Sequence, residues 1–109
     1  MEVILLLDLL IQNGIIVDGT GREPYKGNIG ILNGKIAVII AEENSSSSIE
    51  AANFLDARGH VVCPGFIDMH SHSDLQIFLD SPSDAKVRQG ITTELLGQDG
   101  LGPAPVTTD

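Results

Sequence analysis

Two histidines separated by a single residue carry the clearest chemical signal in the chain. His70 and His72 follow a short apolar run. Side chains alternate along a β-strand, so residues two apart point to the same side if the strand extends that far. Two imidazoles that converge in this way can bind one divalent cation. The same spacing also occurs in solvated turns without any ligand role, so the surrounding elements must decide between the two interpretations.

The elements around the histidines favour a metal site. A Pro-Gly pair makes a sharp turn before residues 66–70, an apolar run that is typical of a strand buried on both faces. A Ser-Pro pair predicts a helix over residues 81–89, and Asp84 near its start and Lys86 near its end suit the helix dipole. Residues 91–96 predict a second strand. Strand, helix and strand form one βαβ unit, with the histidines at the end of its first strand.

Several segments resemble one known enzyme family. Residues 64–72 read Pro-Gly-Phe-Ile-Asp-Met-His-Ser-His and resemble the first barrel strand of the metal-dependent amidohydrolase superfamily. Residues 8–21, residues 72–75 and residues 88–93 resemble the N-acyl-D-amino-acid deacylase (D-aminoacylase) branch. The combination is specific, although no single segment is. It implies a TIM-type (β/α)8 barrel, which needs about 250 residues. The chain has 109 residues, so we expect an N-terminal fragment of such an enzyme.

The resemblance also implies a ligand set. In the deacylase branch the loop after the second strand reads Gly-Asn-Cys-Gly, and its cysteine binds metal. Here the loop reads Gly-Gln-Asp-Gly, so Asp99 stands in place of that cysteine. A carboxylate is a harder ligand than a thiolate, although an Asp-Gly turn without a ligand role is the alternative. The predicted metal ligands are His70, His72 and Asp99, with one or two zinc ions as cofactor. Asp68 and Asp74 are predicted to support these ligands through hydrogen bonds.

The implied activity is zinc-dependent hydrolysis of the amide bond of N-acyl-D-amino acids. The family's general base would lie beyond Asp109, so no catalytic residue is predicted within the chain and we expect the chain alone to be inactive. Two alternatives stay open. One is a fragment of a cyclic-amide hydrolase similar to dihydroorotase or hydantoinase. The other is a non-catalytic β module that self-associates through exposed strand edges.

The first part of the chain has the signals of short strands and turns. Residues 1–63 predict a small, sandwich-like and incomplete β domain, and residues 64–109 predict the start of the barrel. Two Asn-Gly pairs between β-branched residues predict type I′ hairpins. The paired segments are residues 9–12 with 15–18 and residues 28–32 with 35–40. Residues 54–57 predict a further strand, and residues 60–63 predict its return partner after an Arg-Gly turn.

The composition of the chain argues against some classes of binding partner. The chain has 15 acidic and 6 basic residues and a net charge of −9, which argues against nucleic acid and anionic membranes as partners. No run approaches the roughly 18 apolar residues of a membrane span. Cys63 is the only cysteine, which excludes an internal disulfide and fits a reducing cytoplasm. We therefore expect a cytoplasmic protein that acts on a small molecule.

Overall fold

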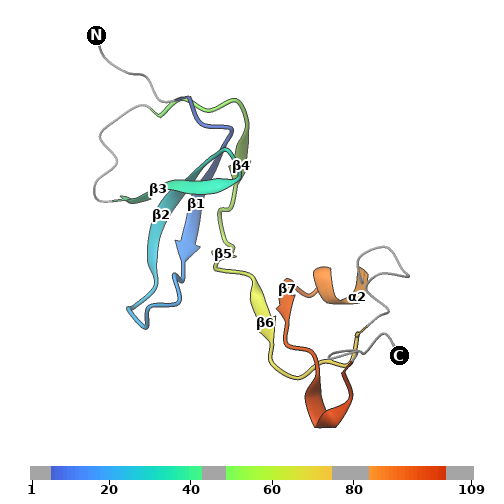
Figure 1. Cartoon of the computed structure of the whole chain (residues 1–109). Coiled ribbons are helices and arrows are strands. Elements are labelled where there is room, and N and C mark those ends of the chain that lie inside the picture. The colour runs from blue at the N-terminus through green and yellow to red at the C-terminus, as the bar shows by residue number, and fades with distance from the viewer. Residues whose placement is uncertain (1–5, 43–48, 75–83, 103–109) are drawn as a thin grey trace. The chain divides into compact units, whose positions relative to one another are not determined.

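The computed structural model of the chain describes residues 6–42, 49–74 and 84–102. The chain forms two compact units, residues 1–64 and residues 65–109. The first contains an open β-sheet, and the second contains a pair of parallel strands with a short helix (Figure 1). Among the described residues, no helix has the length and apolar character needed to cross a membrane.

Five strands make up the sheet of the first unit, and β1 lies at its centre. The order is β3-β2-β1-β4, and β5 also pairs with β1 (Figure 1). The strands are β1 (Leu9–Ile16), β2 (Tyr25–Leu32), β3 (Lys35–Ala41), β4 (Phe54–Asp56) and β5 (Val61–Val62). The largest fully buried side chains are Leu7, Leu10 and Ile16, so the small core of this unit lies on β1 and the residues just before it.

The hairpin predicted at the second Asn-Gly pair is confirmed. Asn33 and Gly34 have φ angles of 53° and 71°, the positive values that a type I′ turn requires at both positions. Leu32 pairs with Lys35 directly across this two-residue loop, and β2 and β3 run antiparallel. Both strands are longer than predicted because their ladder continues as far as the pair Gly27–Ala41.

The hairpin predicted at the first Asn-Gly pair is wrong. Asn13 has a φ of 62°, but Gly14 lacks the positive φ that a type I′ turn also needs. β1 continues through the pair, and its register on β2 shifts between Ile11 and Gly14, which makes a β-bulge. The backbone N–H of Asn13 donates to Asn28 Oδ1 at 3.0 Å, and its side-chain amide donates to Asp56 Oδ1 at 2.9 Å. Neighbouring strands thus supply the hydrogen bonds that a turn would have made locally.

The return strand predicted after the Arg-Gly turn is also wrong. β4 and β5 both run parallel to β1, with Leu10 opposite Phe54 and Ile15 opposite Val61. The chain therefore leaves the edge of β1 after β4 and rejoins it in the same direction. β4 pairs with residues 10–12 of β1 and β5 with residues 15–16, so neither short strand pairs with Asn13 or Gly14, where the pairing with β2 is also irregular.

The second unit contains β6 (Phe66–Asp68), α2 (Asp84–Val87), β7 (Ile91–Glu94) and the 3₁₀ turn η2 (Gln98–Gly100). The predicted order of strand, helix and strand is confirmed, and β6 and β7 pair in parallel. Both strands are shorter than predicted. The predicted helix start at Ser81 and Pro82 lies outside the described residues. Gly65 allows β6 to lie close to β7, since a Cβ atom there would stand 2.1 Å from Oγ1 of Thr92.

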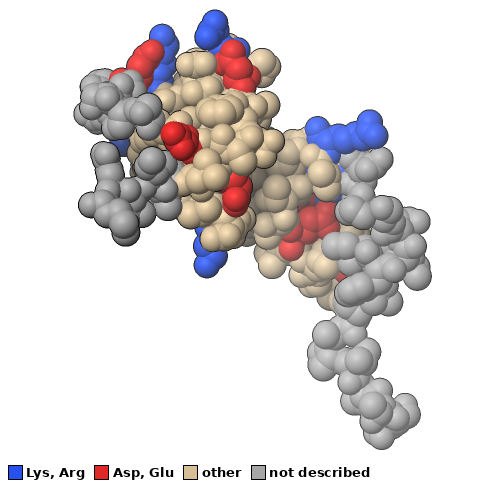
Figure 2. Space-filling view, turned by 90° about the horizontal axis from the view of Figure 1, so that it is seen from above, with Lys and Arg blue, Asp and Glu red and all other residues tan. Residues whose placement is uncertain are grey.

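The expected burial of the first strand on both faces is wrong for this chain. The side chains of Phe66 and Ile67 are 56% and 61% exposed. A two-stranded sheet with one short helix offers too few neighbours to cover both faces, since strands buried on both sides need layers above and below. Exposed apolar side chains also occur on the first unit, and the described surface in Figure 2 is mostly tan, which marks residues that are neither acidic nor basic.

Candidate metal centre

The loops that follow β6 and β7 carry three possible metal ligands to one place. Oδ2 of Asp99 lies 2.9 Å from Nε2 of His70 and 3.2 Å from Nε2 of His72. The centroids of the two imidazole rings are 5.2 Å apart, and the ring planes are inclined by 64°. β6 ends at Asp68, so the turn after the strand, and not strand alternation, aligns the histidines. The structure thus brings together the three residues that the sequence singled out.

The geometry of this group fits a metal ion. The ligand atoms of the three residues all lie within 4.8 Å of one another. In a tetrahedral zinc site with bonds of about 2.0–2.1 Å, neighbouring ligand atoms stand roughly 3.3 Å apart. The two measured separations from Asp99 are close to that value. Two imidazoles with one carboxylate suit zinc and similar transition metals, whereas calcium and magnesium prefer oxygen ligands alone.

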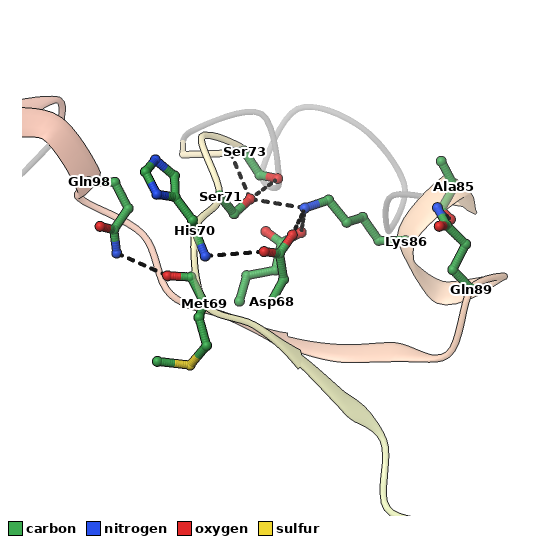
Figure 3. Close-up of polar contacts among 10 residues, drawn as sticks. Asp68, Met69, His70, Ser71, Ser73, Ala85, Lys86, Gln89 and Gln98 are labelled. Carbon is green, nitrogen blue, oxygen red and sulfur yellow. Dashed lines mark hydrogen bonds and ion pairs between the residues drawn. The ribbon is translucent and has the colours of Figure 1, made fainter.

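The backbone of the second loop explains how Asp99 reaches the histidines. Gly97 has a φ of 79° and Asp99 has a φ of 56°, both in the left-handed region. Aspartate tolerates this conformation better than most residues, and glycine adopts it freely. The side-chain amide of Gln98 donates to the backbone oxygen of Met69 at 3.3 Å, which ties the second loop to the first (Figure 3). The same Asp-Gly turn that offered an alternative interpretation therefore holds the carboxylate near the imidazoles.

Asp68 supports the turn that carries His70. Its Oδ1 accepts the backbone N–H of His70 at 3.1 Å, and its Oδ2 accepts a hydrogen bond from Nζ of Lys86 (Figure 3). The hydrogen bond from Lys86 is the main cause that lowers the pKa of Asp68 from its ordinary value of 3.8, and the bond from His70 adds to it. Asp68 is therefore charged at neutral pH and holds the first residue of the turn.

Lys86 joins the ends of the two strands. Besides Asp68, Nζ of Lys86 contacts Oε1 of Glu94 at 3.0 Å and Oγ of Ser71 at 3.1 Å. The hydrogen bonds with Asp68 and then Glu94 raise the pKa of Lys86. Lys86 is likewise the main cause that lowers the pKa of Glu94, followed by Ser73. These are partly covered groups, since the side chains of Lys86 and Glu94 are 27% and 13% exposed.

Asp74 stands apart from this arrangement. Its Oδ1 is buried without a hydrogen-bond partner in the part of the chain that the structure describes. Its φ of 38° marks a tight left-handed turn immediately after the histidines. No described hydrogen bond joins Asp74 to His72, so its role as a support for that ring stays a prediction.

Sequence reasoning missed Lys86, Glu94 and Ser71 as parts of the site. The local pattern indicates only a dipole role for Lys86 and only a strand position for Glu94. One signal in the sequence points to Lys86 and Glu94. The strand ends carry acidic residues, Asp68 and Glu94, and parallel strands end on the same side of a sheet. Two carboxylates brought together in this way need a cation, and the connecting helix carries a lysine.

Comparison with known proteins places these observations in a family, although no protein-family model matches the chain. The chain is 40% identical over 100 residues to the N-acyl-D-glutamate deacylase of Alcaligenes xylosoxydans xylosoxydans, covering 91% of this chain and 20% of that protein. Over 92% of this chain and 20% of the other, it matches a D-aminoacylase structure with a TM-score of 0.79 and 32% identity. That D-aminoacylase has a binuclear metal centre. The chain thus spans about a fifth of the length of these relatives.

Two further structures separate the enzymatic alternatives. The N-acyl-D-glutamate deacylase of Bordetella bronchiseptica matches with a TM-score of 0.80 and 38% identity over 94% of this chain and 21% of that protein. That enzyme was solved with zinc and a phosphonate inhibitor that mimics the tetrahedral intermediate. The L-hydantoinase of Arthrobacter aurescens matches with a lower TM-score of 0.64 over 82% of this chain and 20% of that protein, at 32% identity. The similarity is greater to the deacylases than to the cyclic-amide hydrolase. The chain is therefore a homologue of the N-acyl-D-amino-acid deacylases in the amidohydrolase family.

Proposed function

We propose that His70, His72 and Asp99 hold a divalent metal ion, with zinc as the first choice, in an enzyme that hydrolyses the amide bond of N-acyl-D-amino acids. The observation that carries the proposal is the convergence of three ligand atoms from two loops within 4.8 Å. The solved deacylase relative that contains zinc supports the choice of ion. A zinc ion at this place would supply Lewis-acid activation of an amide carbonyl and of water near neutral pH.

The three side chains also determine when such an ion can be held. Imidazole binds metals in its neutral form through a free nitrogen lone pair, and a protonated imidazole has none. Nε2 of His70 and Nε2 of His72 both face Oδ2 of Asp99, at 2.9 Å and 3.2 Å. Protons compete with an ion for such ligand atoms, so we expect metal affinity to fall as the solution becomes more acidic.

We further propose that β6, α2 and β7 form the first βαβ unit of a TIM-type barrel. The parallel pairing of β6 and β7 with a helix between them in sequence supports this proposal. In such barrels the loops at the C-terminal ends of the strands carry the active site, and the three ligands lie in loops of that kind. Residues 64–109 would then be the start of the barrel, and residues 1–63 an incomplete β domain.

A chimera tests the proposed activity directly. The 100 residues of the Alcaligenes N-acyl-D-glutamate deacylase that align with this chain are replaced by the chain itself. We expect the folded chimera to hydrolyse N-acetyl-D-amino acids, to leave the L-enantiomers intact, and to lose activity with His70→Ala or His72→Ala. The isolated chain should show no turnover. Full activity of the chimera after either histidine substitution would contradict the proposal.

A second, non-catalytic candidate has support from surface composition. Ile36 and Ile39 on β3 and Phe54 and Leu55 on β4 are exposed apolar side chains, and these strands lie at opposite sides of β1 and β2. Open strand edges with apolar side chains favour association between copies. Sedimentation of the chain across a range of concentrations decides this candidate, since a monomer at every concentration would exclude it.

A further inference from the structure

The three ligand residues all lie outside regular strands, so something other than the β-ladder must fix their backbone. His70 and His72 follow the end of β6, and Asp99 lies in η2. Loop residues occupy one conformation only when hydrogen bonds or packing hold them, because ordering each residue costs conformational entropy. The contacts of residues 68–73 show what holds the first loop.

Two groups of hydrogen bonds hold this loop. In the first group, the loop bonds to the strand end beside it: Leu95 N–H donates to the oxygen of Asp68 at 2.8 Å, and Ser71 N–H donates to the oxygen of Leu95 at 3.3 Å. In the second group, side chains hold the backbone at two corners. Asp68 Oδ1 accepts the N–H of His70, and Ser71 Oγ accepts the N–H of Ser73 at 3.4 Å. The first corner contains His70, and the second lies next to His72.

Lys86 is the group common to both corners. Its ammonium has three protons and three oxygen partners, which are Oδ2 of Asp68, Oγ of Ser71 and Oε1 of Glu94. Asp68 holds the amide of His70, and Ser71 holds the amide of Ser73, next to His72. Figure 3 shows Lys86 reaching from α2 toward Asp68 and Ser71, while the ring of His70 points away from it. Among the described contacts, Lys86 therefore bonds to the supports of both histidines and to neither ring.

The charges of Asp68 and Glu94 make the turn that carries His70 depend still more on Lys86. Asp68 and Glu94 both direct a carboxylate oxygen at Nζ of Lys86. Without the ammonium, two carboxylates of like charge would face each other at partly covered positions, and one of them would have to move. If Asp68 moves, the N–H of His70 loses its acceptor, and the ring of His70 loses its fixed place relative to Asp99.

We propose that Lys86 is a positioning residue for the metal centre, because it fixes the turn that holds His70 and His72 against Asp99. This inference rests on the proposed metal site. It goes beyond that site by assigning a role to a residue of α2 that provides no ligand atom. Outer groups that orient metal ligands typically contribute about 10- to 100-fold to metal affinity.

The test compares Co²⁺ binding by the 109-residue chain with binding by Lys86→Met and Lys86→Arg. Co²⁺ reports affinity by titration and ligand geometry by its visible absorption spectrum. We expect Lys86→Met to weaken Co²⁺ binding about 10- to 100-fold and to change the spectrum. Lys86→Arg keeps the charge and the donors, so it should recover most of the affinity. Lys35→Met, which removes a lysine of the first unit, is the matched control and should bind as the wild type does.

A second readout works without metal. Exchange of the backbone amide hydrogens of His70 and Ser73, measured by NMR on the metal-free chain, should become faster in Lys86→Met and stay unchanged in Lys35→Met.

If the wild-type chain binds no Co²⁺, the proposed metal site is contradicted, and amide exchange alone decides whether Lys86 fixes the turn. If Lys86→Met fails to fold, the variant Lys86→Met with Glu94→Gln removes one charge of each sign and takes its place. Wild-type Co²⁺ affinity, spectrum and amide exchange in the folded variant, even with lowered thermal stability, would overturn the inference.

Discussion

Oδ2 of Asp99 lies 2.9 Å from Nε2 of His70, although the two residues are 29 positions apart along the chain. Parallel pairing of β6 and β7 causes this proximity, because it brings the ends of both strands to one side of the sheet. His72 approaches the same oxygen at 3.2 Å.

Substitution of Asp99 should change both the affinity of the site for zinc and its preference between zinc and manganese. Asp99→Ala removes one of three ligands, so zinc binding by the chain should weaken by at least the roughly 10- to 100-fold that loss of a supporting group costs. Asp99→Cys supplies a thiolate, which is softer than a carboxylate, so it should retain zinc binding and bind manganese less well. Competitive titrations with zinc and manganese measure both effects. Equal affinities for wild type and Asp99→Ala would reduce Asp99 to a turn residue.

Acid should destabilise the second unit through Asp68 and Glu94. Hydrogen bonds from Lys86 hold the pKa values of both carboxyls below their ordinary values of 3.8 and 4.5. A group with a lowered pKa in the folded state stabilises fully above its unfolded value and loses this contribution as the pH falls through the folded value. The melting temperature of the wild type should therefore fall as the pH drops below the ordinary values of 4.5 and 3.8 and through the lowered pKa values of the two folded carboxyls. Lys86→Met should show a shallower fall, and parallel curves for both proteins would contradict this account.

Gly65 should tolerate no side chain. A Cβ atom at Gly65 would stand 2.1 Å from Oγ1 and 2.4 Å from Cγ2 of Thr92, so Gly65→Ala must push β6 away from β7. Overpacking of this kind costs about 1–3 kcal/mol of folding free energy. Thermal unfolding should show the loss, and Thr92→Ala in the same chain should recover part of it. An unchanged melting temperature in Gly65→Ala would show that the two strands adapt freely.

Asn13 should be replaceable only by residues that accept its backbone conformation. Its φ of 62° is costly for β-branched residues, and glycine adopts it freely. Asn13→Val should destabilise the first unit by about 1–2 kcal/mol through this strain alone. Asn13→Gly should cost less, although it loses the hydrogen bond to Asp56. Denaturant unfolding of both variants measures the difference, and equal stability would argue against the bulge.

Local signals in the sequence were sufficient for some parts of the structure. Asn33 and Gly34 both adopt positive φ, so the turn chemistry of that pair alone determined a hairpin. The same dipeptide at Asn13 failed as a predictor because distant residues, Asn28 and Asp56, supply its hydrogen bonds. No local pattern contains that information. The lengths of β6 and β7 were overestimated and those of β2 and β3 underestimated for the same reason, since a ladder extends only as far as its partner strand does.

The residues of the candidate site also fall into two groups, those that the sequence indicated and those that it did not. His70 and His72 were recognised by spacing, and Asp99 by its place in a loop that resembles one family. Lys86 was not recognised, because its role depends on two carboxylates that lie on different strands. A helical lysine with solvent around it has the same local sequence pattern as one that joins two strand ends. Only the parallel pairing of β6 and β7 distinguishes the two cases.

The central claim is that His70, His72 and Asp99 bind one metal ion, and X-ray absorption of the zinc-loaded chain tests it most directly. We expect a first coordination shell of nitrogen and oxygen at about 2.0–2.1 Å with the scattering pattern of imidazole, lost in His70→Ala and in His72→Ala. Cys63 is an exposed free thiol and therefore competes for zinc as a sulfur ligand. Zinc bound by sulfur at about 2.3 Å, or a spectrum unchanged by removal of either histidine, would contradict the claim.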